Sequence, residues 1–217
     1  RRLSILRVNS ENATHGTYNM IQSEGRTYRT FTPIANVRPL DSESNAEGAK
    51  GSIPVWIRAR VHRIRSAGKL CFLVLRSGFS TVQAVVEGNE DPQLLKFVQK
   101  SLVPESIIDI LAYPAQANVT SCTQKDVELQ VKRLFVVNNP KKDLAFQVDD
   151  SQRAENEEGV RVMRDLRLDN RVLDLRAPRH AAIMSVQSAL VDAWRQALRE
   201  RGFTEIHTPK LIKGASE

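Results

Sequence analysis

Apolar and polar residues alternate along VWIRARVHR, from Val55 to Arg63. Every second residue up to Val61 is apolar, and the residues between them carry ring or charged side chains. Because successive side chains of an extended chain point to opposite faces, this period of two predicts a half-buried β-strand. Residues 66–69 (SAGK) and 77–80 (SGFS) are turn signals, so we expect a second strand over 70–76 and a third over 81–88.

One helix interrupts this series of strands. Asp91 followed by Pro92 predicts a helix start, since Asp caps the first free amide groups and Pro fits the first helical position. We expect the helix over residues 92–102 and two further strands over 105–113 and 126–137. Five short strands with a helix between the third and the fourth are typical of an OB-fold barrel. An SH3-like barrel is the alternative, although it does not usually place a helix there.

The segments on either side of this barrel have other patterns. Residues 1–37 show no clean period, and residues 38–52 have the Ser, Gly and Glu content of a linker. Residues 138–163 are polar and acidic, as in an interdomain hinge. Apolar residues recur at helical spacing in 180–202, and 203–212 predicts a strand. We expect an extension and linker at 1–52, the barrel at 53–138, a hinge at 139–176 and the start of a second domain at 177–217.

Composition and charge narrow the class of protein. The hydrophobic content of 41% and charged content of 26% are ordinary for a soluble globular protein, with no membrane span or secretory signal. Two cysteines, Cys71 and Cys122, predict reduced cytosolic thiols rather than a disulfide framework or a metal site. The net charge is +7, and residues 55–86 hold six basic residues and no carboxylate. Such a strip favours a polyanionic partner.

The faces of the predicted strands identify candidate contacts. The odd-numbered residues of the second strand are uniformly apolar, which makes them the better core and puts Phe72 on the outer face. By the same alternation Gln83 and Glu128 lie on the polar faces of the third and fifth strands. An aromatic ring can stack on a base, an amide can pair with a base edge, and a carboxylate can accept from an exocyclic amino group. From the pattern alone, Phe72 is either a stacking platform or a core residue.

No catalytic set is complete in this sequence. It contains no Gly-rich phosphate loop and no defensible Ser–His–Asp combination, and the four histidines are scattered. We expect these histidines to be structural or solvated.

Several stretches resemble the N-terminal half of aspartyl-tRNA synthetases of the eukaryotic cytosolic type, in class IIb. The matching stretches cover most of residues 17–217 and are VWIRARVHRIRSAGKLCFLVLR, TVQAVV, ESIIDI, SCTQKDVELQV, RLDNRVLDLR and RGFTEIHTPKLIKGASE. The resemblance implies that the barrel binds the anticodon of tRNA(Asp). It also implies a cytoplasmic protein. The sequence itself lacks an initiator Met, so we expect a fragment or a processed form.

The resemblance assigns roles to four barrel residues. Arg65 would contact the anticodon loop, and Phe72 would stack on the central uridine. Gln83 would bind the same region, and Glu128 would help to recognise the third anticodon base. We expect the other arginines of the basic strip to attract phosphates in general.

The end of the chain resembles motif 1 of class II synthetases, a long helix followed by a strand that ends in Pro. Gly202, Phe203 and Pro209 match this motif, which implies a homodimer interface. The last residues, GASE, resemble the start of the mobile loop, so Ser216 and Glu217 would approach aspartate. The fold class implied is a mainly β OB-fold barrel, then a hinge, then the opening helix and strand of an α+β class II catalytic domain.

The family's reaction activates aspartate with ATP and transfers it to the 3′ end of tRNA(Asp). Motifs 2 and 3, which hold ATP and Mg²⁺, would lie beyond Glu217, so we expect no catalytic residue in this chain and no activity from it alone. Two alternatives remain open at this point. One is part of a lysyl- or asparaginyl-tRNA synthetase, and the other is a non-catalytic OB-fold protein that binds nucleic acid.

Overall fold

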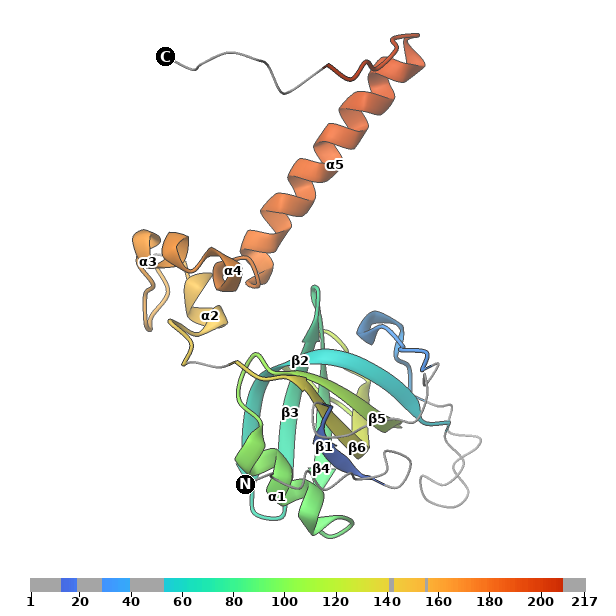
Figure 1. Cartoon of the computed structure of the whole chain (residues 1–217), viewed down its shortest axis with the longest axis vertical. Coiled ribbons are helices and arrows are strands. Elements are labelled where there is room, and N and C mark those ends of the chain that lie inside the picture. Colours follow the sequence, from blue (N-terminus) through green and yellow to red (C-terminus); the bar gives the residue numbers. More distant parts are fainter. Residues whose placement is uncertain (1–12, 19–28, 40–52, 141–142, 155, 209–217) are drawn as a thin grey trace, which may run out of the picture. The chain divides into compact units, whose positions relative to one another are not determined.

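The computed structural model describes residues 13–18, 29–39, 53–140, 143–154 and 156–208 (Figure 1). The chain divides into two compact units, residues 1–144 and 145–217. Three of the candidate residues, Pro209, Ser216 and Glu217, lie outside the described residues. Within the described ranges, no helix has both the length and the apolar character that a membrane crossing requires.

The first unit contains a closed barrel of five strands. These are β2 (Val55–Ala67), β3 (Leu70–Ser77), β4 (Ser80–Glu87), β5 (Ile107–Gln116) and β6 (Val127–Asn138). The hydrogen-bonded order is β6-β4-β3-β2-β5, and a further pairing of β6 with β5 closes the barrel. Helix α1 (Pro92–Ser101) lies in the chain between β4 and β5 (Figure 1). This order confirms the OB-fold prediction.

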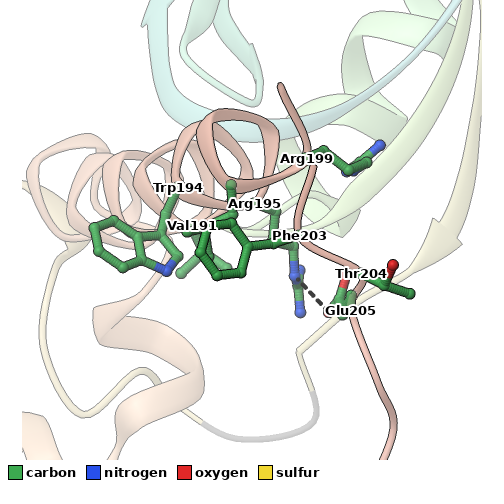
Figure 2. A pocket seen from close by; sticks show the side chains of 8 residues that line it. Val191, Trp194, Arg195, Arg199, Phe203, Thr204 and Glu205 are labelled. Atoms are coloured by element: carbon green, nitrogen blue, oxygen red, sulfur yellow. Dashed lines mark hydrogen bonds and ion pairs between the residues drawn. The ribbon is translucent and has the colours of Figure 1, made fainter. Parts of the chain in front are cut away.

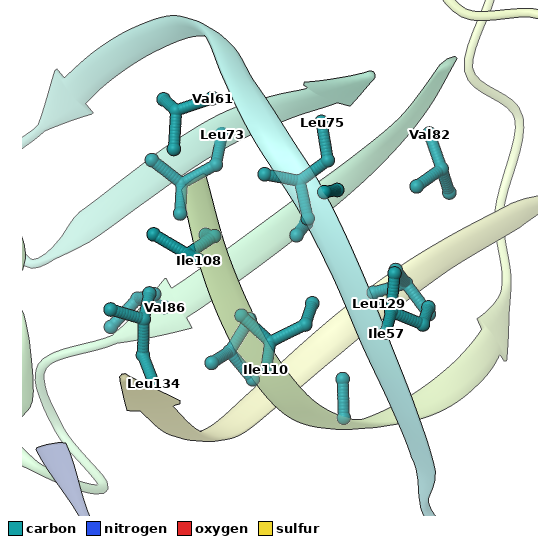
Figure 3. Packing of buried hydrophobic residues seen from close by; sticks show 14 of the residues in the cluster. Ile57, Val61, Leu73, Leu75, Val82, Val86, Ile108, Ile110, Leu129 and Leu134 are labelled. Carbon is teal, nitrogen blue, oxygen red and sulfur yellow. The ribbon is translucent and has the colours of Figure 1, made fainter. Parts of the chain in front are cut away.

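Alternating residues of these strands fill the interior of the barrel. Figure 3 shows ten labelled aliphatic side chains that converge there, and each is fully buried: Ile57, Val61, Leu73, Leu75, Val82, Val86, Ile108, Ile110, Leu129 and Leu134. Burying one such side chain contributes about 1.5–3 kcal/mol. The predicted core face of β3 is therefore confirmed, and it determines which side chains are left on the outer face.

Helix α1 begins as the sequence predicts. The carboxylate oxygen Oδ1 of Asp91 accepts hydrogen bonds from the backbone N–H groups of Gln93 (3.0 Å) and Leu94 (2.9 Å). These bonds satisfy two donors that have no partner within the helix. The buried face of the helix, with Leu94 and Val98, joins the hydrophobic core of the barrel.

The segment before the barrel contributes to the fold, which its sequence did not indicate. Strand β1 (His15–Thr17) pairs in parallel with β6, and a short 3-10 helix, η1 (Ile34–Asn36), follows. The side chains of Ile34 and Val37 are only 1% and 2% exposed and belong to the barrel core. Part of the predicted extension and linker is therefore integral to the barrel.

Asp109 on β5 joins this segment to the outer side of the barrel. Its carboxylate is fully buried and accepts hydrogen bonds from Nε (2.6 Å) and Nη2 (2.8 Å) of Arg58 and from the hydroxyl of Tyr18 (2.7 Å). The guanidinium carbon of Arg29 lies 4.1 Å from the ring centroid of Trp56, a cation–π contact. Long-range contacts such as these cannot be inferred from a period of two.

The second unit is helical. It contains α2 (Val148–Ser151), α3 (Arg164–Asp169), α4 (Arg171–Asp174) and α5 (Pro178–Glu200). Asp174 is fully buried, and its Oδ1 lies 2.8 Å from Nδ1 of His180. The predicted long helix is confirmed as α5, and Gly202 follows it with a φ of 83°, a left-handed conformation that suits Gly.

The strand predicted after this helix is absent from the described residues. Residues 203–208 have no regular secondary structure. A strand is stabilised by hydrogen bonds to a neighbouring strand, and none of the described residues pairs with this segment. The alternation of apolar and polar residues gave no information on whether a partner strand is present.

Candidate nucleic-acid interface

Four of the predicted contact residues lie close together on the outer face of the barrel. Arg65 on β2 lies opposite Phe72 on β3. Val74, two residues after Phe72, lies opposite Gln83 on β4, and Gln83 lies opposite Glu128 on β6. Neighbouring strands are about 4.8 Å apart. The four side chains therefore extend across four adjacent strands, a span suited to a few nucleotides.

Phe72 lies on the outer face and is not part of the core. Cys71 and Leu73 on either side of it are fully buried, while the Phe72 side chain is half-buried. Arg65 beside it is exposed. A partly exposed ring next to a cationic side chain offers a flat apolar surface and a positive charge to the same ligand.

Gln83 and Glu128 form a direct hydrogen bond across β4 and β6. Nε2 of Gln83 donates to Oε2 of Glu128, and both side chains are half-buried. The bond restricts the rotation of both groups, which lowers the entropy that a ligand would have to remove on binding. An ordered amide and an ordered carboxylate together can select hydrogen-bonding groups on a base edge.

A β-bulge on β2 places Arg65 on this face. Val61 pairs with Leu75 and Arg63 pairs with Val74, so His62 is an extra residue on β2. Simple alternation would place residues 63 and 65 on the core side with Val61. The bulge shifts the alternation by one residue, and Arg63 and Arg65 are both exposed as a result.

Two arginines of the basic strip do not fit the general phosphate role that we expected. Arg76 shares the face of Phe72, but it is only 4% exposed and its Nη2 lies 2.6 Å from Oε1 of Glu105. Arg58 is half-exposed and forms its ion pair with Asp109. A carboxylate in contact offsets the positive charge of each guanidinium. These ion pairs disfavour a phosphate role for Arg58 and Arg76, and for the rest of the strip the expectation stays a prediction.

The loop between β5 and β6 is tied to the same side of the barrel. Thr81 and Thr123 exchange hydrogen bonds, with Thr81 N–H donating to Oγ1 of Thr123 (2.7 Å) and Thr123 N–H donating to Oγ1 of Thr81 (2.9 Å). Nε2 of Gln124 donates to the carbonyl of Ile34 (3.0 Å). The loop next to Gln83 is thus held by β4 and by η1, a contact that sequence reasoning missed.

The segment that resembles motif 1 contains the end of α5 and the residues after it. A groove there is lined by Val191, Trp194, Phe203 and the paired side chains of Arg195 and Glu205, whose Nε and Oε1 lie 3.0 Å apart (Figure 2). Several apolar side chains of this region are exposed, among them Trp194 (67%) and Phe203 (63%). Contiguous exposed apolar surface can mark a binding site for another protein, a membrane or a ligand.

Comparisons with known proteins agree with this architecture. A family model described as an OB-fold nucleic acid binding domain matches residues 55–137, and one described as tRNA synthetases class II (D, K and N) matches residues 163–217. The cytoplasmic aspartate–tRNA ligase of Caenorhabditis elegans is 39% identical over 94% of this chain. The chain spans 39% of the length of that relative.

Solved structures of aspartyl-tRNA synthetases are also more similar to this chain than those of asparaginyl-tRNA synthetases. A putative aspartyl-tRNA synthetase from Leishmania major Friedlin has a TM-score of 0.78 at 33% identity, covering 94% of this chain and 39% of its own. An asparaginyl-tRNA synthetase from Pyrococcus horikoshii is less similar, with a TM-score of 0.61 at 26% identity over 76% of this chain and 35% of its own. The aspartyl-tRNA synthetases are therefore favoured over the lysyl and asparaginyl alternatives. The chain belongs to the aspartate–tRNA ligase family of class II tRNA synthetases.

Proposed function

We propose that the barrel binds the anticodon loop of tRNA(Asp) and that the parent protein is a cytoplasmic aspartate–tRNA ligase. The observation that carries this proposal is the set of outward side chains, Arg65, Phe72 and the bonded pair Gln83–Glu128, on adjacent strands of an OB-fold barrel. OB-folds commonly bind single-stranded nucleic acids on such a face.

Each residue of the set has a chemical role in this proposal. Phe72 stacks on the central uridine of the anticodon, and Arg65 contacts the backbone of the loop. Gln83 donates to and accepts from the same region, and Glu128 accepts a hydrogen bond from an amino group of the third base. The hydrogen bond between Gln83 and Glu128 supports this assignment because it orders both groups before the RNA binds.

Substitution of Phe72 by Ala tests the proposal. A stacked base gains about 1–3 kcal/mol from an aromatic platform, so the Kd for a synthetic tRNA(Asp) anticodon stem-loop should rise about 5- to 150-fold. Phe79 is a matched control, because it is an exposed Phe in the turn between β3 and β4. Phe79→Ala should leave the Kd unchanged. If Phe72→Ala binds the stem-loop as tightly as Phe79→Ala does, the stacking role is wrong.

The reaction of the parent protein is the activation of aspartate with ATP and its transfer to the 3′ end of tRNA(Asp). Class II synthetases in general use ATP and Mg²⁺. By the resemblance, motifs 2 and 3 of the parent protein would supply the ligands of ATP and Mg²⁺. We assign aspartate binding to Ser216 and Glu217 by their match to the mobile loop.

We also propose that α5 and the residues that follow it form a homodimer interface. The exposed apolar side chains of Trp194 and Phe203 support this, as does the match of Gly202, Phe203 and Pro209 to motif 1. Analytical ultracentrifugation should show a dimer for the parent protein and a monomer for its Trp194→Asp variant. A dimer that persists in this variant at low micromolar concentration would argue against the assignment.

A non-catalytic OB-fold protein is the remaining alternative. The match of residues 163–217 to the class II synthetase model disfavours it. Such a protein would bind unrelated single strands as tightly as the anticodon stem-loop. Competition with a stem-loop whose three anticodon bases are replaced separates the two, because only anticodon recognition gives a large difference in Kd.

A further inference from the structure

The bulge on β2 lies where this strand changes its partner. Residues Val55–Arg60 of β2 pair with β5, and residues from Arg60 to Ala67 pair with β3. The extra residue, His62, lies two residues after this junction. A bulge increases the local twist and bends the strand. The bulge therefore helps to curve the barrel, and it also determines the direction in which Arg63 and Arg65 point.

Hydrogen bonds from the loop between α1 and β5 hold the bulge in place. The N–H of Val61 donates to the carbonyl of Ser106 (2.8 Å), and the N–H of Glu105 donates to the carbonyl of Val61 (2.7 Å). Nη2 of Arg76 donates to Oε1 of Glu105 (2.6 Å), while its Nη1 lies 3.2 Å from Nδ1 of His62. The guanidinium of Arg76 thus links the bulged residue, His62, to the loop between α1 and β5.

Two features of this contact are unfavourable for folding by themselves. Glu105 has a φ of 68°, in the left-handed region that a non-Gly residue adopts only at a cost in free energy. Arg76 and Glu105 are 4% and 3% exposed, so both charges are desolvated. A buried ion pair often contributes no more stability than two apolar residues of similar size. Overall stability therefore does not account for this pair. Buried polar groups can instead set the register of paired elements, as they do in coiled coils.

We propose that Arg76 and Glu105 are positioning residues of the nucleic-acid interface. They hold the His62 bulge, and the bulge directs Arg65 outward beside Phe72. Without the bulge, the alternation on β2 would continue from Val61, and the side chain of residue 65 would point toward the core. This inference rests on the proposed function, because it takes Arg65 as a contact to the anticodon loop.

A double-mutant cycle tests the coupling between the pair and Arg65. Arg65→Ala should raise the Kd for the tRNA(Asp) anticodon stem-loop about tenfold, as expected for the loss of one Arg contact. In the background Arg76→Met/Glu105→Leu, the same Arg65→Ala change should raise the Kd less than about threefold. The smaller effect is expected because Arg65 is no longer held on the binding face.

The ion pair between Arg58 and Asp109 provides a matched control. The background Arg58→Met/Asp109→Leu also removes one Arg and one carboxylate from the barrel, but this pair joins β2 to β5 at a distance from the bulge. Arg65→Ala should keep its full effect of about tenfold there. A general loss of stability or charge would reduce the effect of Arg65→Ala on the Kd in both backgrounds. A positioning role of Arg76 and Glu105 reduces it only in the Arg76→Met/Glu105→Leu background.

The outcomes separate the two proposals. If Arg65→Ala leaves the Kd of the otherwise unchanged protein as it was, the contact assigned to Arg65 is wrong. If Arg65→Ala has its full effect both in the unchanged protein and in the Arg76→Met/Glu105→Leu background, the positioning role is overturned.

Circular dichroism will show whether this background is folded. If it is not, Arg76→Lys replaces it, because Lys keeps the charge but cannot contact Glu105 and His62 with one planar group. A full tenfold effect of Arg65→Ala in that variant also overturns the proposal.

Discussion

Replacement of Asp109 by Asn tests how the N-terminal segment is fixed to the barrel. The carboxylate of Asp109 is fully buried and accepts two hydrogen bonds from Arg58 and one from the hydroxyl of Tyr18. Asn keeps the shape of the side chain but has a single acceptor oxygen and no charge. Its amide group would direct N–H donors toward the donors of Arg58 or Tyr18.

The magnitude follows from these contacts. A hydrogen bond to a charged group contributes about 1.5–3 kcal/mol. The Arg58 side chain is 50% exposed, so water can replace part of what its guanidinium loses. Tyr18 is only partly exposed, and its hydroxyl would lose a charged acceptor. We therefore expect Asp109→Asn to lower the free energy of unfolding by about 3 kcal/mol. In a chain of this size, that corresponds to a fall in Tm of about 6–12 °C.

Tryptophan fluorescence during urea unfolding can measure this change. The sequence has two Trp residues, so in a Trp194→Phe background only Trp56 reports. Trp56 lies in the cluster with Arg29 and Phe135 and therefore senses both the barrel and the N-terminal segment. Asp126→Asn is the control, since Asp126 is an exposed carboxylate near the start of β6 and should change stability by less than about 0.5 kcal/mol. A similarly small effect of Asp109→Asn would refute the argument.

Two further predictions concern the same unit. Burial and the hydrogen bond to Asp109 raise the pKa of Tyr18 above its ordinary value of 10.0. The contribution of the Tyr18 hydroxyl to stability is therefore fully present below pH 10 and is lost as the pH rises further. The difference in the free energy of unfolding between wild type and Tyr18→Phe, measured with urea, should shrink above pH 10. A constant difference up to pH 11.5 would contradict this. Asp91→Ala removes the cap of α1 and should cost about 1 kcal/mol, measured in the same way. Asp91→Asn, which can still cap, should recover most of that loss.

The sequence by itself determined the number and order of the barrel strands. Alternation along residues 70–76 was enough to assign Leu73 to the core and Phe72 to the outer face, because a period of two leaves only two possible faces and burial of apolar area selects one. Asp91 and Pro92 located the start of α1 for a local reason as well, since a cap acts on amide groups two or three residues away. The resemblance to a known family, rather than the periodicity, linked Arg65 to a binding role.

Only the tertiary structure decided which charged residues are available to a ligand. Arg58 and Arg76 belong to the same basic strip as Arg65, yet carboxylates 51 and 29 residues away in the chain offset their charge. The bulge at His62 likewise depends on the connection after α1, which the alternation on β2 does not encode. Local periodicity reflects the preference of each residue for water or the core. The partner of a buried charge and the register of a bent strand depend on which distant segments the closed barrel brings into contact.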